Sequence, residues 1–347
     1  MRTGAWRRFA AACLAVWTAH AAAQPSDCTV AAGPACYQRF EPPGAGGMLN
    51  YYASLVPGEG EGAAPTQALI ALHGHPRDAG KTFGAALRAV RDAGALRDTL
   101  VVAPVFQVAA DQAARCRSPG VPAAQAGDLL WTCSSWIEGG PSANGERISS
   151  FAAMDALVAE LVRRWPGLRT VTVAGFSAGG QMVQHYIGFA NPAPAGASAS
   201  ASTVALRYVV ADPGTWLYFD AWRPHPPTDG SCPGVNRWKY GTDGLPGGLG
   251  RSAAQAHAHY ATADVHYLEG ALDSSDARGT YYGILDKSCA AMAQGPYRLQ
   301  RGLAYAEYDR TLLAPGRRRG VVVVPGCAHD VACVFPSEAA RAVLLGR

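Results

Sequence analysis

A serine between glycines is the residue in this chain best suited to nucleophilic chemistry. Ser177 is the centre of the sequence GFSAG at 175–179, between an apolar stretch at 170–174 and a helical pattern that extends to Phe189. Between a strand and a helix, the G-x-S-x-G spacing places the serine on a sharp turn with its hydroxyl exposed. The pattern predicts a nucleophile; the alternative is a glycine-rich turn, since glycine makes up 40 of the 347 residues.

A serine hydroxyl becomes a good nucleophile only when a base accepts its proton, and histidine is the usual base. His329 follows the last apolar stretch, in the sequence PGCAHD at 325–330. His185 falls on the helix behind the serine, where packing is the expected role. His73 precedes a glycine in a loop, where a structural role is expected. His329 is the predicted base, a choice that rests on the family resemblance described below.

A carboxylate is needed to orient the imidazole. Asp273 comes shortly after the apolar stretch at 264–268 and is the predicted acid, with a turn-capping aspartate as the alternative role. Asp276 is the second candidate, and Asp212 is the third. We expect the neighbouring carboxylate to raise the pKa of His329 above its ordinary value of about 6.5, because it favours the charged imidazolium.

Two backbone N–H groups are needed to stabilise an oxyanion. One donor is predicted to be Ala178, directly after the serine. The other is expected in the sequence HGHP at 73–76. Because Pro76 has no N–H, His75 is the predicted donor, with Arg77 as the alternative.

The elements that would position these residues alternate between strands and helices. A helix is predicted at 151–165, capped by Ser149 or Ser150 and ended by Pro166. Continuous apolar runs are typical of parallel strands buried on both faces. Six such strands are predicted, at 66–72, 100–105, 170–174, 207–211, 264–268 and 320–324. The alternation predicts an α/β fold with a mostly parallel central sheet flanked by helices.

Together, the sequences LHG, GFSAGG, GALD and PGCAH resemble the α/β-hydrolase superfamily, and in particular secreted esterases of the polyester-depolymerase or feruloyl-esterase type. The resemblance covers about residues 50–347. It implies a base on the loop after the last strand, as at His329, with the order serine, acid, histidine. It also implies hydrolysis of small or polymeric esters without a cofactor. A peptidase of the same fold and a non-catalytic binding protein are the alternatives.

A long segment at 212–263, between the fourth and fifth predicted strands, is expected to be a cap insertion. Its aromatic side chains have two interpretations. Trp216, Tyr218 and Trp222 could line a substrate pocket, or they could form the core of the cap itself.

The N-terminus resembles a signal peptide covering residues 1–23, which leaves one catalytic domain at 24–347. Arg2, Arg7 and Arg8 precede a short apolar stretch, and an A-x-A site follows at 21–23. These arginines supply three of the four net positive charges, so nothing in the charge of the mature chain suggests a nucleic-acid partner. No other stretch is apolar enough to span a membrane. We therefore expect export to the periplasm or the exterior.

Cysteine usage agrees with export. Apart from Cys13 in the leader, eight cysteines remain, an even number that favours disulfides in an oxidising compartment. No C-x-x-C pair suggests zinc, and no metal is predicted. Proximity favours four pairs, although spacing alone does not fix them: Cys28 with Cys36, Cys116 with Cys133, Cys232 with Cys289, and Cys327 with Cys333.

Overall fold

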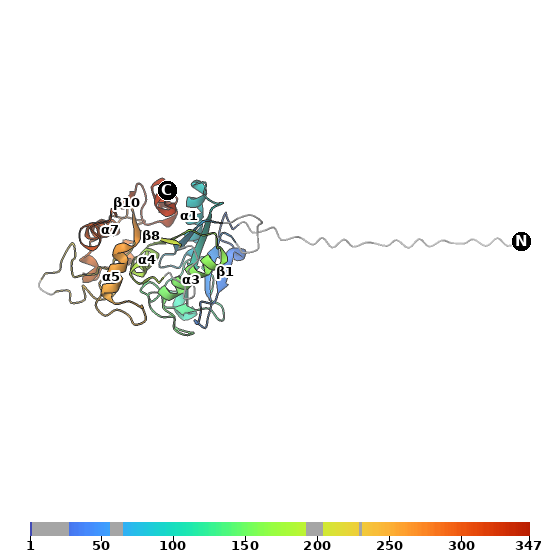
Figure 1. Ribbon diagram of the computed structural model, residues 1–347, viewed down its shortest axis with the longest axis horizontal. Helices are drawn as coiled ribbons and strands as arrows, with labels where there is room; N and C mark the ends of the chain where they lie inside the picture. The colour runs from blue at the N-terminus through green and yellow to red at the C-terminus, as the bar shows by residue number, and fades with distance from the viewer. Residues whose placement is uncertain (2–27, 56–64, 192–203, 229–230) are drawn as a thin grey trace.

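The computed structural model of the chain describes Met1 and residues 28–55, 65–191, 204–228 and 231–347 (Figure 1). The predicted signal peptide lies almost entirely outside these residues. Within the described ranges, no helix is both long and apolar enough to cross a bilayer.

An eight-stranded sheet forms the centre of the molecule, in the order β1-β2-β4-β3-β7-β8-β9-β10. From β4 onwards along this order neighbouring strands are parallel, whereas β2 is antiparallel to both β1 and β4. The strands are β1 (Tyr37–Phe40), β2 (Leu49–Ala53), β3 (Gln67–Leu72), β4 (Thr99–Val105), β7 (Thr170–Phe176), β8 (Ala205–Ala211), β9 (Asp264–Gly270) and β10 (Val321–Val324). Strands β5 (Gln107–Val108) and β6 (Leu130–Trp131) form a separate parallel pair.

The six strands predicted from apolar runs correspond to β3, β4, β7, β8, β9 and β10, and the mostly parallel sheet is confirmed. Every residue of β4 is buried, as expected for a strand covered on both faces. The antiparallel strands β1 and β2 were not predicted. Strand β1 has the sequence YQRF, whose two central polar residues interrupt any apolar run.

Helices cover both faces of this sheet (Figure 1). One buried cluster joins the sheet to α3 (Ser150–Arg164), α4 (Ala178–Phe189), α5 (Ala253–Thr262) and α7 (Arg298–Tyr308). The other cluster joins the opposite face to α1 (Ala79–Asp92), α8 (Val331–Val334) and α9 (Glu338–Leu345). Two further short helices are α2 (Ala110–Ala113) and α6 (Cys289–Met292).

The predicted helix at 151–165 corresponds to α3. It is capped by Ser149, whose hydroxyl accepts a hydrogen bond from the Ala152 N–H at 3.0 Å. This bond satisfies one of the amides that a helix N-terminus leaves without an intrahelical partner.

Four disulfides are present, and they join the four pairs favoured by proximity. Cys327–Cys333 closes the loop after β10, and Cys116–Cys133 ties together two loops that lie beside β5 and β6. Disulfides therefore brace the carboxyl side of the sheet, where the loops after the parallel strands gather.

Candidate active site

Ser177 lies on a strained turn between β7 and α4. Its backbone has φ 59° and ψ −121°, a conformation that non-glycine residues rarely adopt and that marks functional sites. The neighbouring glycines make the turn feasible. A Cβ at Gly179 would lie 2.5 Å from the carbonyl oxygens of Leu72 and His73, and a Cβ at Gly175 would collide with the backbone of Gly179. The turn thus fits against the end of β3 only with glycine at these positions.

The structure brings Ser177, His329 and Asp273 into one hydrogen-bonded chain. The Nε2 of His329 lies 2.8 Å from the Oγ of Ser177, and its Nδ1 lies 2.7 Å from the Oδ2 of Asp273. A carboxylate can only accept, so Nδ1 carries the hydrogen and Nε2 is free to accept the proton of the serine. Asp273 and His329 are buried, and Ser177 is half-buried beside a cavity.

The two other candidate acids form no hydrogen bond with His329. Asp276 is exposed on the loop after β9. Asp212 is buried beside the triad, but its Oδ1 accepts from the Gly270 N–H at 2.8 Å. Asp212, Asp273 and His329 offer ligand atoms within 4.8 Å of one another. Both ring nitrogens of His329 already have hydrogen-bond partners, however, so neither is free to bind a metal.

The pKa of His329 differs from the expectation. Burial lowers the pKa of His329 below its ordinary value and outweighs the hydrogen bond that Nδ1–H donates to Asp273, which acts in the opposite direction. The prediction of a raised pKa is therefore wrong in sign. The sequence identified the carboxylate but not the loss of solvent, which depends on packing against Phe176, whose ring centroid lies 4.8 Å from that of the imidazole.

The loop after β3 leaves one amide suited to an oxyanion. The Gly74 N–H donates to Asp78 Oδ1 at 3.2 Å, and the Arg77 N–H donates to the Gly74 carbonyl at 3.0 Å. Among the described residues, the N–H of His75 has no acceptor, and His75 lines the same cavity as Ser177 and Ala178. This geometry favours His75 over Arg77 as the second donor.

His73 and His185 pack in the structure, as predicted. His73 is buried between the carbonyl of Gly74 at 2.8 Å and the N–H of Phe106 at 3.3 Å. Burial lowers its pKa to about 4. His185 contacts the carbonyls of Gln181 and Lys239, and burial again lowers its pKa to about 4. Neither imidazole contacts the serine.

A cavity of about 460 Å³ opens beside Ser177. Its wall combines the loop after β3, the loop after α2, the start of α4 and the segment around residue 285. Apolar side chains line one part, and charged side chains line another. These two sets are Ile137, Ile284 and Leu285, and Arg115, Arg117, Glu138, Lys239, Asp286 and Arg298.

The aromatic residues proposed for the substrate pocket do not line this cavity. Trp216 is fully buried and stacks on Tyr305 of α7, with ring centroids 4.4 Å apart. Tyr218 is also fully buried, and Trp222 stacks on Tyr308 at 5.5 Å. The substrate-binding assignment of Trp216, Tyr218 and Trp222 is therefore corrected. Trp216 and Tyr218 belong to the main buried cluster between the sheet and α7, not to a separate core of the cap, whereas Trp222 is 37% exposed.

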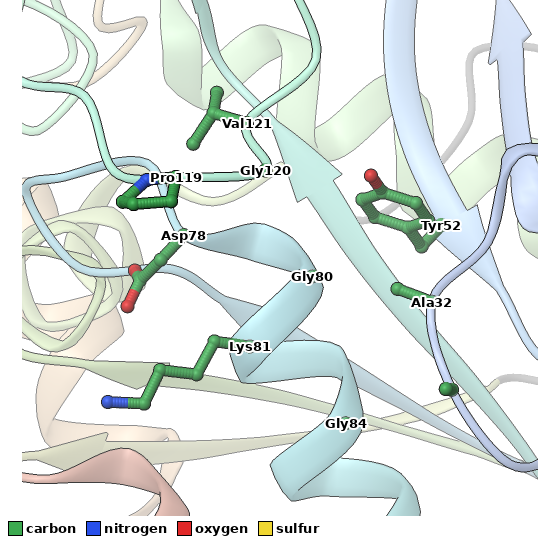
Figure 2. Close-up of a pocket in the computed structure, with 10 residues that line it drawn as sticks. Ala32, Tyr52, Asp78, Gly80, Lys81, Gly84, Pro119, Gly120 and Val121 are labelled. Atoms are coloured by element: carbon green, nitrogen blue, oxygen red, sulfur yellow. The ribbon is translucent and has the colours of Figure 1, made fainter.

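A second cavity, of about 340 Å³, lies on the other side of the loop after β3 (Figure 2). Figure 2 shows Asp78 and Lys81 on one wall and Tyr52 with Ala32 on another. Its charged side chains are already partnered, since Asp78 accepts from Gly74 and Lys81 forms a 2.8 Å ion pair with Asp330. No member of the triad lines it, so the cavity at Ser177 is the candidate site.

Comparison with known proteins identifies the architecture. No protein family and no curated protein sequence matches the chain. Solved structures do match. Poly(aspartic acid) hydrolase-1 from Sphingomonas sp. KT-1 is 18% identical with a TM-score of 0.60, over 89% of this chain and 97% of that one. The poly(3-hydroxybutyrate) depolymerase LpqC from Bordetella parapertussis is 19% identical with a TM-score of 0.56, over 87% and 86%. The chain has the α/β-hydrolase fold.

Within this α/β-hydrolase fold, the sequence did not indicate the residues around the acid. Arg298, the first residue of α7, donates to Asp273 Oδ1 at 3.3 Å and to the Thr280 carbonyl at 2.6 Å. Below Asp273 lie two more buried carboxyl groups, Asp212 and Glu269. Burial raises the pKa of Asp212 to about 7 and raises that of Glu269 well above its usual range. No motif marks Arg298 or Glu269, and Asp212 was considered only as an alternative acid.

Proposed function

We propose that the chain is an exported serine hydrolase that cleaves carboxylic esters through an acyl-enzyme intermediate. The observation that carries the proposal is the hydrogen-bonded series Ser177–His329–Asp273 on a strained turn at a cavity. Perturbed, buried titratable groups aligned with a nucleophile at a cavity are the usual mark of acyl-transfer chemistry.

The geometry supports a defined sequence of steps. His329 Nε2 accepts the proton of Ser177 as Oγ attacks the ester carbonyl carbon. The N–H groups of Ala178 and His75 then stabilise the oxyanion of the tetrahedral intermediate, aided by the N-terminus of α4. When the intermediate collapses, His329 returns the proton to the leaving alcohol. Water, activated by His329 in the same way, then attacks the acyl-enzyme and releases the acid. Asp273 stabilises the imidazolium in both halves of the reaction.

Amide hydrolysis is the second candidate function, and the comparison with solved structures is the reason to retain it. One solved structure with this fold is a depolymerase of poly(3-hydroxybutyrate), a polyester, and the other is named a hydrolase of poly(aspartic acid). We place esters first because an alkoxide is a better leaving group than an amine, although His329 can protonate either leaving group. The substrate of this chain is a small or polymeric ester.

Export accounts for the four disulfides, which persist in oxidising compartments. The proposed domain is residues 24–347, after removal of a signal peptide at 1–23. The segment at 212–263 serves as a partial cap, because Gly214 and Lys239 contribute to the wall of the cavity.

A fluorophosphonate probe tests the proposal directly. Wild-type protein should be labelled at Ser177, and Ser177→Ala should not be labelled although it keeps its melting temperature. A panel of nitrophenyl esters and matching anilides then separates esterase from amidase activity. A non-catalytic binding protein would show neither labelling nor turnover.

A further inference from the structure

Two arginines in the cavity beside Ser177 lack a partner of opposite charge. Arg115 and Arg117 both line this cavity, and both are exposed. Within the described part of the chain, neither guanidinium has a hydrogen-bond acceptor or a carboxylate within ion-pair distance. Two uncompensated positive charges therefore face the space where a substrate must lie.

The other charges of the cavity have partners. Lys239 lies 3.4 Å from a carboxylate oxygen of Asp286 and 3.7 Å from one of Glu138, so one cation is shared by two carboxylates. Asp286 also accepts from the hydroxyl of Tyr240 at 2.6 Å, and these donors hold its pKa at about 2 against the effect of burial. Arg298 is bound to Asp273. Arg115 and Arg117 together outweigh the one carboxylate charge in excess at Lys239, so the wall of the cavity is net positive.

The backbone that carries these arginines is fixed to the oxyanion loop. Cys116, which lies between them, is bonded to Cys133. The carbonyl of Cys116 accepts from the Nε of buried Arg77 at 3.1 Å, and Ser118 donates to the carbonyl of Pro76 at 3.3 Å. The backbone position of Arg115 and Arg117 relative to the oxyanion loop is consequently set by the fold, even though both side chains reach solvent.

His75 lies near two other cations on the same wall. Burial is the main cause of its lowered pKa, and the charges of Arg77 and Lys239 lower it further. A positively charged imidazole is therefore disfavoured there, and His75 adds no charge of its own to the site. Ile137 and Leu285 line the same cavity as the two arginines. The part of a ligand between its charged group and its ester can therefore be apolar.

We propose that the substrate is an ester that carries a carboxylate a few bonds from the scissile bond, and that Arg115 and Arg117 bind this carboxylate while the ester lies at Ser177. The inference rests on the proposed esterase function and specifies its substrate class. Guanidinium groups suit this task because their planar donors match the two oxygens of a carboxylate. The carboxylate could belong to the acyl part, as in a half-ester of a diacid, or to the alcohol part, as in an acylated hydroxy acid.

Matched esters test the proposal. The acyl arm compares nitrophenyl hemiglutarate with nitrophenyl valerate, and the alcohol arm compares O-acetyl-3-hydroxybutyrate with its methyl ester. Wild-type protein should show the higher kcat/KM for the charged member in at least one arm. In that arm, Arg115→Gln/Arg117→Gln should lower the charged-to-neutral ratio about fivefold, chiefly through KM, because partly solvated pairs contribute modestly. Added salt should lower the wild-type ratio as well.

The control removes two charges elsewhere. Arg97 and Arg318 are exposed and do not line the cavity, so Arg97→Gln/Arg318→Gln should leave the ratio unchanged. A ratio that responds equally to both double variants, or a preference for a cationic ester, overturns the proposal. Calorimetry with glutarate provides a readout independent of turnover. If no ester is hydrolysed, the esterase function fails, and equal glutarate affinity in wild type and Arg115→Gln/Arg117→Gln then overturns the anion site too.

Discussion

The guanidinium of Arg298 lies 3.3 Å from Oδ1 of Asp273, the carboxylate oxygen that His329 does not use. Both partners are buried, with 4% and 2% of their side chains exposed. The acid of the triad is thus held from two sides, by the imidazole and by the first residue of α7. In the proposed mechanism Arg298 acts on the reaction through Asp273, as a positioning residue.

Replacing this arginine should alter both stability and the titration of the base. Arg298→Met leaves the Asp273 carboxylate without its buried partner, a change that costs roughly 3–5 kcal/mol of folding free energy in comparable cases. The positive charge of Arg298 also lowers the pKa of His329, so its removal should move the acid limb of kcat/KM to higher pH. Chemical denaturation and pH–rate profiles measure the two effects.

Arg298→Lys is the matched control, since it keeps the charge without the planar donors. It should restore most of the pH profile and only part of the stability. A pH profile that is unchanged in Arg298→Met would contradict a positioning role and leave Arg298 as a purely structural residue.

The choice between candidate acids can be tested by isosteric replacement. Asp273→Asn removes the charge that stabilises the imidazolium and the acceptor that fixes its tautomer, so kcat should fall by roughly 10⁴. Asp276→Asn, three residues further along the exposed loop, should keep nearly full activity. Turnover of a nitrophenyl ester measures both. Loss of activity in the Asp276 variant alone would move the acid to that position.

The pH dependence follows from the lowered pKa of His329. The imidazole must be neutral to accept the serine proton, and burial disfavours its charged form. The rising limb of kcat/KM in the free enzyme should therefore lie below pH 6.5 rather than near neutrality. A midpoint above 7, measured with a neutral ester at constant ionic strength, would show that the Asp273 carboxylate outweighs burial.

Residues that a motif or a strand end marks could be predicted from the sequence, and residues without such a marker could not. The strands β3, β4 and β7 and the turn at Ser177 follow from apolar runs and glycine spacing within a few residues. Asp273 and His329 follow from their places after β9 and β10. Arg298 carries no such signal, because it is the first residue of α7 and follows neither a strand nor a motif. The wrong assignment of Trp216 to the substrate pocket has the same cause, because its burial depends on Tyr305 of α7, which no motif marks.

The last prediction concerns the loop that carries His329. Cys327 and Cys333 form a disulfide across a separation of only six residues, so the imidazole lies inside the closed loop. The backbone before the bridge is also held, since the Cys327 carbonyl accepts from the Leu272 N–H at 2.8 Å. Cys327→Ser/Cys333→Ser should lose about 2 kcal/mol of stability, because so short a loop restricts the unfolded chain little.

Activity should fall further than stability in this double variant. Hydrolysis depends on the 2.8 Å contact between His329 and Ser177, and a displacement of about 1 Å can lower a rate by on the order of 10². The matched control is Cys232→Ser/Cys289→Ser, which opens a loop of 57 residues whose cysteines do not line the cavity. It should lose more stability than the first variant and less activity. Melting curves and kcat/KM of the two variants give the comparison, and the opposite ranking in activity would show that the hydrogen bonds of the loop hold His329 without the bridge.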